Sequence, residues 1–243
     1  MRSIFLKEVN AFFSSLIGYI VIGTFLVLTG LVMFVFPESS ILNYNYATLE
    51  QLFSNAPLIF LFLIPAITMR SLAEEQQSGT IEFLTTKPLT DLQIILGKYF
   101  ASLLLVAFAL LPTLLYYFTV HTLGAPKGNL DSGAILGSYL GLFLLAGAFA
   151  AVGLFASSLS PNQIVAFILG ALLCAMLHWG FDAFSRLPIF TGRGDDVVQM
   201  LGINYHYASI SRGILDSRDV IYFFSVIAFF IALTATSLGR RKW

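Results

Sequence analysis

Apolar runs long enough to cross a lipid bilayer recur along the whole chain and restrict it to a membrane fold. A helix crossing the hydrocarbon core needs roughly 20 apolar residues. Six such runs cover about residues 12–36, 52–69, 99–120, 133–158, 161–179 and 220–238. Only 11% of the 243 residues are charged, whereas soluble domains are about a quarter charged. We therefore expect an all-α polytopic membrane protein that forms one domain over residues 1–243.

The first ten residues mix charged and apolar side chains before the first run. Ile4, Phe5, Leu6 and Val9 alternate with charged residues, which are Arg2, Lys7 and Glu8. This pattern is typical of a short amphipathic helix that lies in the membrane interface. We expect a surface helix on the cytoplasmic side, followed by the first span.

The segment from Arg70 to Lys98, between the second and third runs, is rich in helix-capping signals. Ser71 with Glu74, and Thr90 with Gln93, each fit a capping box that opens a helix. Gly79 suits the position after a helix end. Between these signals, Thr80 can cap a short helix over residues 81–86, which Lys87-Pro88 would end.

This short helix would present apolar side chains outside the lipid. Ile81, Phe83 and Leu84 form the apolar part, and Glu82 lies near the positive N-terminal end of the helix. An apolar patch of this kind most often docks on a neighbouring protein. The alternative is that residues 70–98 are only a solvated connection.

Two of the runs contain residues that affect helix packing. Gly133, Gly137 and Gly141 recur at four-residue spacing in the fourth run, and small faces of this kind allow close helix packing. We expect this span at the centre of the subunit, with a dimer contact as the alternative. Pro57 and Pro65 predict kinks in the second span, where neighbouring helices would satisfy the freed carbonyl groups.

The distribution of Lys and Arg predicts that both termini are cytoplasmic. Six spans put the termini on one side of the membrane. That side would carry eight basic residues, namely Arg2, Lys7, Arg70, Lys87, Lys98, Arg240, Arg241 and Lys242. The other side would carry five, namely Lys127, Arg186, Arg193, Arg212 and Arg218. By the positive-inside rule, the segment from Arg70 to Lys98 is then cytoplasmic as well.

No motif indicates catalysis, a resident metal or nucleic-acid binding. The chain has no G-x-x-x-x-G-K-[ST] phosphate loop, its three His residues share no metal-ligand spacing, and its net charge is zero. His178 and Asp182 are four residues apart near the outer end of the fifth run. We interpret them as interface anchors, with a functional pair as the alternative. We expect no catalytic residues, no bound metal and no cofactor held by this chain.

Two longer stretches resemble the permease subunits of ABC type-2 transporters. Residues 75–100 combine acidic residues, Gly79-Thr80, a Leu-rich turn, Pro88 and Gly97-Lys98 at the start of the third span. Residues 203–224 combine an aromatic and polar stretch with Arg212-Gly213-Ile214-Leu215 and then Asp219-Val220. Within that family the chain is most similar to the gliding-motility-associated ABC permease of Bacteroidetes.

The resemblance implies a role for the segment between the second and third spans. In the family, the first cytoplasmic loop forms a coupling helix that fits a groove on a separate ATPase subunit. The corresponding docking residues here would be Glu74, Glu75, Gly79, Thr80, Ile81, Glu82, Phe83 and Leu84. Glu74 and Glu75 would face either the basic rim of that ATPase or the surface helix at Arg2 and Lys7. ATP and Mg²⁺ would bind in that ATPase. The resemblance also implies a second membrane subunit or a homodimer, in the bacterial cytoplasmic (inner) membrane.

Two other functions fit a polytopic membrane protein. An ion-coupled secondary carrier usually has ionisable residues deep within its spans, and the apolar runs here are almost free of charge. A non-transporting membrane scaffold could recruit partners through residues 70–98, and the sequence does not separate it from a permease subunit. A neighbouring reading frame for a phosphate-loop ATPase without membrane spans would favour the permease.

The predicted topology can be tested by cysteine labelling. The variant Thr191→Cys, in the last outer loop, should react with a membrane-impermeant maleimide in intact cells, because that loop would face outwards. A variant that also replaces the single native cysteine, Cys174, removes background labelling. Labelling at position 191 only after lysis would contradict the topology.

Overall fold

The computed structural model describes residues 1–37, 39–44, 47–80, 90–187 and 193–239. Within these ranges the chain is helical and contains no strand. Five continuous helical segments are long and apolar enough to cross a membrane, and a bent pair at the N-terminus can provide a sixth crossing. The expected all-α polytopic architecture is therefore confirmed at this level. Residues 81–84 of the expected docking helix and the basic residues 240–242 lie outside the described ranges.

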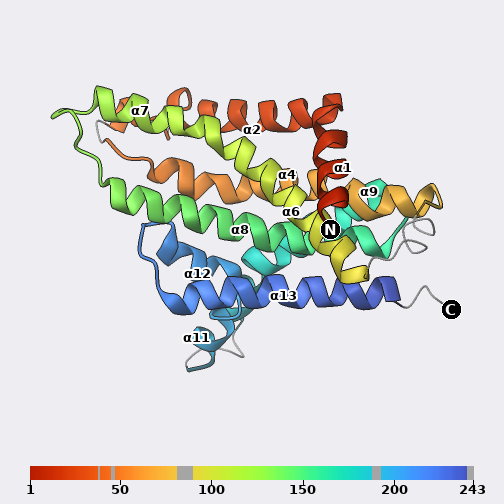
Figure 1. Ribbon diagram of the computed structural model, residues 1–243. Coiled ribbons are helices and arrows are strands. Elements are labelled where there is room, and N and C mark those ends of the chain that lie inside the picture. Colours follow the sequence, from red (N-terminus) through yellow and green to blue (C-terminus); the bar gives the residue numbers. More distant parts are fainter. Residues whose placement is uncertain (38, 45–46, 81–89, 188–192, 240–243) are drawn as a thin grey trace.

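The long helices run side by side in alternating directions (Figure 1). The long helical segments are built from α2 (Leu16–Phe34), α4 (Glu50–Gln77), α6 (Asp91–Leu110) with α7 (Leu114–Leu123), α8 (Ser132–Leu159), α9 (Gln163–Ala175) with α10 (Phe181–Ser185), and α13 (Ser217–Gly239). A 3-10 turn at Leu111–Thr113 joins α6 to α7, and a π-helical turn at Met176–Gly180 joins α9 to α10. The shorter helices are α1 (Arg2–Phe13), α3 (Ile41–Tyr44), α11 (Arg193–Gln199) and α12 (Ile203–Ile210).

The two ends of the bundle carry different elements. One end holds α1, the last turns of α4 and α13, and the first turn of α6; we call it the α1 end (Figure 1). The other holds α11 and α12, and we call it the α11 end. Since α1 and the last residue of α13 lie at the same end, the described parts of both termini lie on one side of the bundle.

Helix α8 occupies the centre of the bundle. It packs against α4, α13, α9, α6 and α12. In the most apolar 18-residue stretch of α8, 78% is buried. The corresponding share is 22% in α9–α10 and 22% in α13. The exposed apolar side chains of α9 and α13 therefore face away from the protein core, where lipid or another subunit would cover them.

Small residues on α8 allow its neighbours to approach closely. A Cβ on Gly141 would overlap the side chain of Ile210 in α12, and one on Gly137 would lie 2.9 Å from the Gly213 carbonyl oxygen. A Cβ on Gly153 would overlap Thr68 in α4. A Cβ on Gly133 would lie 3.3 Å from Asp131 Oδ1, in the carboxylate that caps the start of α8. Gly137 and Gly141 thus pack against α12 and the turn after it, not against another long helix.

The first span begins later than the sequence indicates. Residues 12–36 read as one run, but α1 ends at Phe13, and Arg2–Phe13 meets Gly18–Phe34 at 68°. The Ser14 and Ser15 hydroxyls donate to the Ala11 and Phe12 carbonyl oxygens at the end of α1. Side-chain hydroxyls that bond to nearby carbonyls compete with continued helix, which explains the break.

A proline in α4 is compensated by a neighbouring helix. Pro57 has no N–H to donate to the Phe53 carbonyl, four residues earlier. The hydroxyl of Tyr207, on α12, donates to that carbonyl oxygen at 2.7 Å. Burial raises the pKa of the Tyr207 hydroxyl, which therefore remains a donor. This contact joins the α11 end of α4 to a helix more than 150 residues later in the chain.

Removing the hydroxyl with Tyr207→Phe should lower the free energy of unfolding by about 1–3 kcal/mol, because the Phe53 carbonyl then remains buried without a donor. In a Pro57→Ala background the same change should cost less, since the new N–H at residue 57 can bond that carbonyl. Unfolding in mixed micelles measures both costs, with the exposed Tyr205→Phe as control. Equal costs in the two backgrounds would contradict this account.

Candidate functional site at the α1 end

Helices α1, α4 and α6 meet at the α1 end of the bundle. Helix α1 packs on α6, and buried Ile4 lies over Gly97, where a Cβ would be 3.1 Å from the Ile4 Cγ2. Gly97 therefore lets α1 approach the backbone of α6. The amphipathic pattern of α1 buries Ile4 and directs Lys7 and Glu8 towards the other two helices.

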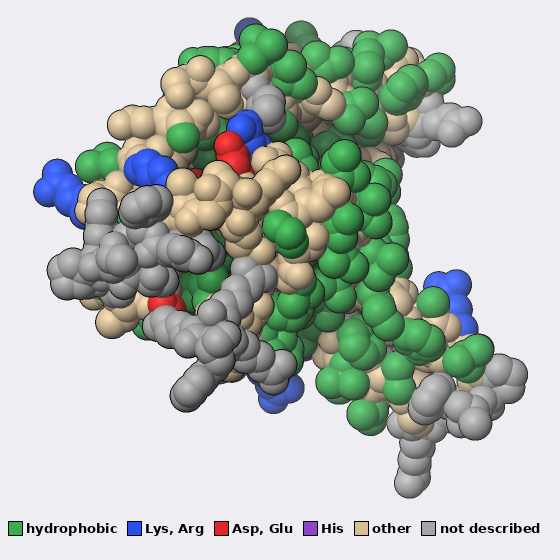
Figure 2. All heavy atoms as spheres, turned by 90° about the vertical axis from the view of Figure 1, so that its right-hand side faces the viewer, with side chains coloured by type: hydrophobic (Ala, Val, Ile, Leu, Met, Phe, Trp, Pro, Cys, Tyr) green, Lys and Arg blue, Asp and Glu red, His purple; other side chains and the backbone are tan. Residues whose placement is uncertain are grey.

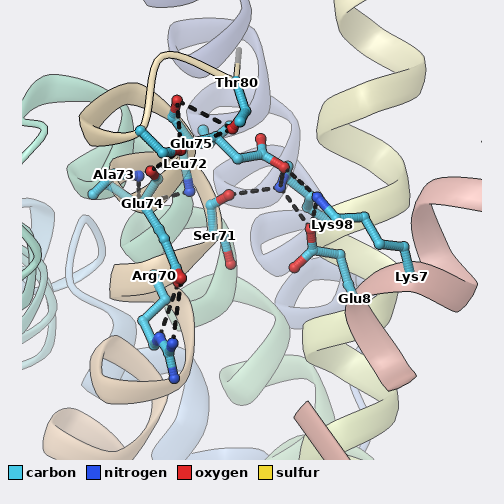
Figure 3. A network of polar contacts seen from close by, with 12 residues as sticks. Lys7, Glu8, Arg70, Ser71, Leu72, Ala73, Glu74, Glu75, Thr80 and Lys98 are labelled. Atoms are coloured by element: carbon cyan, nitrogen blue, oxygen red, sulfur yellow. Dashed lines mark hydrogen bonds and ion pairs between the residues drawn. The ribbon is translucent and has the colours of Figure 1, made fainter. Parts of the chain in front are cut away.

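Four charged side chains join these three helices, and we call them the Lys98 network: Lys7 and Glu8 on α1, Glu75 on α4 and Lys98 on α6 (Figure 3). The Lys98 ammonium lies 2.7 Å from Glu8 Oε1 and 3.0 Å from Glu75 Oε1. Lys98 also donates to the Ser71 carbonyl oxygen at 2.6 Å. The Lys7 ammonium contacts Glu75 Oε1 at 2.7 Å.

Burial makes this network energetically important. The Lys98 side chain has 0% exposure, and the Glu75 side chain has 9%. A charge this far from water is tolerated only when opposite charges and hydrogen bonds surround it. Lys98 has two carboxylates and one carbonyl as partners, so α1 and α4 must both be in place for α6 to bury it.

Helix α4 is also attached to the end of α8, through what we call the Ser157 clamp. The Ser157 hydroxyl oxygen accepts from the backbone N–H groups of Leu72 and Ala73, each at 3.0 Å. The same hydroxyl donates to the Met69 carbonyl oxygen at 2.9 Å. Next to it, Gln76 Nε2 donates to the Ser157 and Ser158 carbonyl oxygens. The last two turns of α4 are thus fixed from two sides.

One predicted helix start is wrong. Ser71 and Glu74 do not form a capping box, because α4 continues through both to Gln77. No residue between Thr68 and Gln77 breaks the helix. Glu74 instead pairs with Arg70, one turn earlier, at 3.0 Å, and both side chains are partly exposed. Glu74 and Glu75 therefore belong to the end of the second span and not to a separate short helix.

Other capping signals are confirmed. Gly79 follows the end of α4 with φ +69°, a conformation that glycine adopts without strain. The Thr90 and Gln93 side chains form both bonds of the capping box at the start of α6. The Thr80 hydroxyl lies 2.9 Å from that of Ser78. Ile81, Glu82, Phe83 and Leu84 lie outside the described residues.

The structure joins the surface helix to the end of α4, which is one of the two alternatives expected for Glu75. Glu75 contacts Lys7, as that alternative predicts, whereas Glu74 pairs with Arg70. The sequence pattern does not predict that Glu8 and Glu75 share Lys98 as a partner. The available signal was the position of Lys98 directly before the third apolar run, with Ile94, Ile95 and Leu96 on its other side, since an ionisable residue among apolar ones needs a partner. Ser157 carried no signal, because serine is ordinary in a helix rich in small residues. For Arg2, no ion pair occurs among the described residues.

His178 also lies differently from expectation. We expected it at the interface, but the π-helical turn places it in the core, 4% exposed and edge-on to Phe149 of α8. Asp182 instead accepts from Asn204 of α12 at 2.7 Å. Within the described ranges, no three His, Cys, Asp or Glu side chains gather as a metal site would require.

The Lys98 network predicts a specific pattern of stabilities. Lys98→Met should lower the free energy of unfolding by about 3–5 kcal/mol, because it leaves Glu8 and Glu75 without their shared partner. Adding Glu8→Gln and Glu75→Gln should restore part of that loss. Arg70→Met, which removes an exposed ion pair, should cost less than about 1 kcal/mol. Equal costs for Lys98→Met and Arg70→Met, measured by unfolding in mixed micelles, would contradict the assignment.

Comparison with known proteins places the chain in a family. The model of the family described as ABC-2 family transporter protein matches residues 37–183, which include all of α4, α6 and α8. A search of curated proteins finds no match to the chain. The match covers more than half of the chain, and the helices agree with a multi-pass membrane component. The chain therefore belongs to the ABC-2 family of transporter proteins.

Proposed function

We propose that this chain is a permease subunit that couples ATP hydrolysis by a separate ABC ATPase to export or to mechanical work across the bacterial cytoplasmic (inner) membrane. Family membership supports a permease subunit and implies an ABC ATPase partner. The observation that carries the coupling is the Lys98 network, which joins the helices on either side of residues 78–90. ATP and Mg²⁺ would bind in the partner.

The coupling element in this proposal is the segment between α4 and α6. Its docking residues are Glu74, Gly79, Thr80, Ile81, Glu82, Phe83 and Leu84. Glu75 is buried and faces Lys7 of the surface helix, so it would hold the segment in place and not contact the ATPase. On its N-terminal side, the Ser157 clamp and Glu75 hold the end of α4. On its C-terminal side, the Thr90 cap and Lys98 hold the start of α6. A displacement of the segment would therefore move both helices, since neither end can yield separately.

Helix α1 would act as the surface helix of the subunit. Its bend of 68° relative to α2 suits a helix that lies along the membrane interface, and Lys7 and Glu8 connect it to the coupling element. With the termini cytoplasmic, as the distribution of Lys and Arg favours, the α1 end would face the ATPase. The network would then transmit movement to the interface as well as to the spans.

The partner in the membrane would be a second permease subunit, identical or homologous. The exposed apolar faces of α9 and α13 offer surfaces for lipid or for that subunit. Gliding motility is the biological process that we propose, on the basis of the resemblance of residues 75–100 and 203–224. The same docking segment would also serve a non-transporting scaffold. Co-purification of the ATPase and its ATP hydrolysis must therefore both be measured.

Changing Ile81 and Leu84 together to Asp should abolish co-purification of the ATPase in mild detergent, because two buried charges would oppose docking. Membrane insertion should be unchanged, since the segment lies between spans. The matched control changes Val197 and Met200 to Asp; both are exposed apolar residues at the α11 end, with the same spacing. The control should retain the ATPase.

The ATPase activity of the recovered complex separates a permease from a scaffold. Reconstituted complex should show hydrolysis that depends on this chain, and the control variant should preserve that dependence. If the Ile81 and Leu84 double variant retained the ATPase at the normal ratio, the docking assignment would be wrong. If hydrolysis were independent of this chain, the scaffold would be favoured.

A further inference from the structure

A cavity of about 250 Å³ lies beside the Lys98 network, between α1, α4 and α6. Its lining changes in character from one side to the other. Ala66, Ile67 and Leu105 form an apolar part, while Lys7, Arg70 and Glu75 contribute charge. Figure 2 looks onto the α1 end of the bundle and shows acidic and basic side chains reaching the surface there. The cavity therefore combines apolar and charged walls at one end of the spans.

Glu75, which lines this cavity, has one carboxylate oxygen without a partner in the described part of the chain. Its Oε1 accepts from Lys7 and contacts Lys98, but its Oε2 is buried and has no hydrogen-bond partner among the described residues. Figure 3 shows this second oxygen turned away from both ammonium groups. A buried carboxylate oxygen without a donor is costly, so a ligand that brings an N–H group would be stabilised there.

Basic groups at the same cavity have donors to spare. Lys7 is 57% exposed, and its one hydrogen-bond acceptor in the described structure is Glu75. Arg70 uses Nε and one terminal nitrogen on Glu74, which leaves the other terminal nitrogen available. A phosphate near these two side chains would gain charge-assisted hydrogen bonds.

Charge balance restricts the ligand further. The cavity and network together contain three basic side chains, Lys7, Arg70 and Lys98, and three acidic ones, Glu8, Glu74 and Glu75. A ligand with net charge would leave an uncompensated charge near a region of low dielectric constant. A zwitterion with a donor ammonium and a phosphate fits both free groups and preserves neutrality.

The position at the end of the spans identifies the source of such a zwitterion. If the long helices span the bilayer, the α1 end would lie near the headgroups of one leaflet, and the apolar wall could receive the first carbons of an acyl chain. We propose that the cavity binds a phospholipid with an ethanolamine headgroup, with its ammonium at Glu75 Oε2 and its phosphate near Lys7 and Arg70. The bound lipid would fill the space between α1 and the coupling helices.

Native mass spectrometry of the lipid-depleted protein tests this site. Dioleoyl phosphatidylethanolamine should bind about tenfold more tightly than the phosphatidylglycerol or phosphatidylcholine with the same chains, because only its headgroup is both zwitterionic and an N–H donor. Glu75→Gln should remove that preference. Ala66→Phe fills the cavity and leaves the charged side chains in place. It should weaken binding of the ethanolamine lipid about tenfold and so also remove the preference.

The control is Glu50→Gln, at the start of α4 on the α11 end, which should leave the preference unchanged. If the Glu75→Gln variant does not fold, the lipid preference of the Ala66→Phe variant tests the proposal by itself. Equal binding of the three lipids, or an unchanged preference in Ala66→Phe, would overturn the proposal. If soluble glycerophosphoethanolamine binds and the lipid does not, the ligand is not a membrane lipid and the proposal is wrong. If the two compete for this cavity, the lipid assignment is supported. The ATPase is absent from this experiment, so its result is independent of the coupling proposal.

Discussion

The buried ammonium of Lys98 is the constraint on which the arrangement at one end of this molecule depends. A fully buried cation needs anions from its surroundings, and here they come from two other helices, Glu8 on α1 and Glu75 on α4. The three helices can therefore be in their native positions only together. Residues 78–90 connect two of them, so the ion network holds together the two helices at the ends of this segment. The Ser157 clamp then ties this unit to α8, the central helix of the bundle.

The rest of the bundle follows from the same rule applied to backbone groups. Within lipid, every N–H and C=O must find a partner inside the protein. The carbonyl that Pro57 leaves free is satisfied by Tyr207, and the α4 N–H groups at Leu72 and Ala73 bond to Ser157. Glycines on α8 allow the close approaches that these bonds require. Helix α4 is thus fixed near both of its ends, by α12 at one and by α8 and the Lys98 network at the other.

The sequence was sufficient for the class of fold and for much of the local structure. Hydropathy predicts the spans because the bilayer imposes their length, and capping chemistry predicts the start of α6 at Thr90 and the turn at Gly79. The break after Phe13 was missed, because hydropathy does not register serine hydroxyls that bond to the preceding turn. The Ser71–Glu74 signal misled, because local capping patterns also occur inside helices that tertiary contacts stabilise. Convergence of Lys7, Glu8 and Glu75 on Lys98 depends on how three helices pack, which no local pattern specifies.

Under the proposed coupling, α1, the end of α4 and the start of α6 would move as one body when the partner ATPase binds and releases nucleotide. Spin labels at Asn10 on α1 and Leu92 on α6, both exposed positions, report on this body directly. A third label at Val197 reports its movement relative to the α11 end. In the complex with the ATPase, pulsed electron–electron double resonance should give one narrow Asn10–Leu92 distance distribution that ATP does not change, while the Leu92–Val197 distance shifts. An Asn10–Leu92 distance that changes with ATP as much as the distance across the bundle would contradict the account.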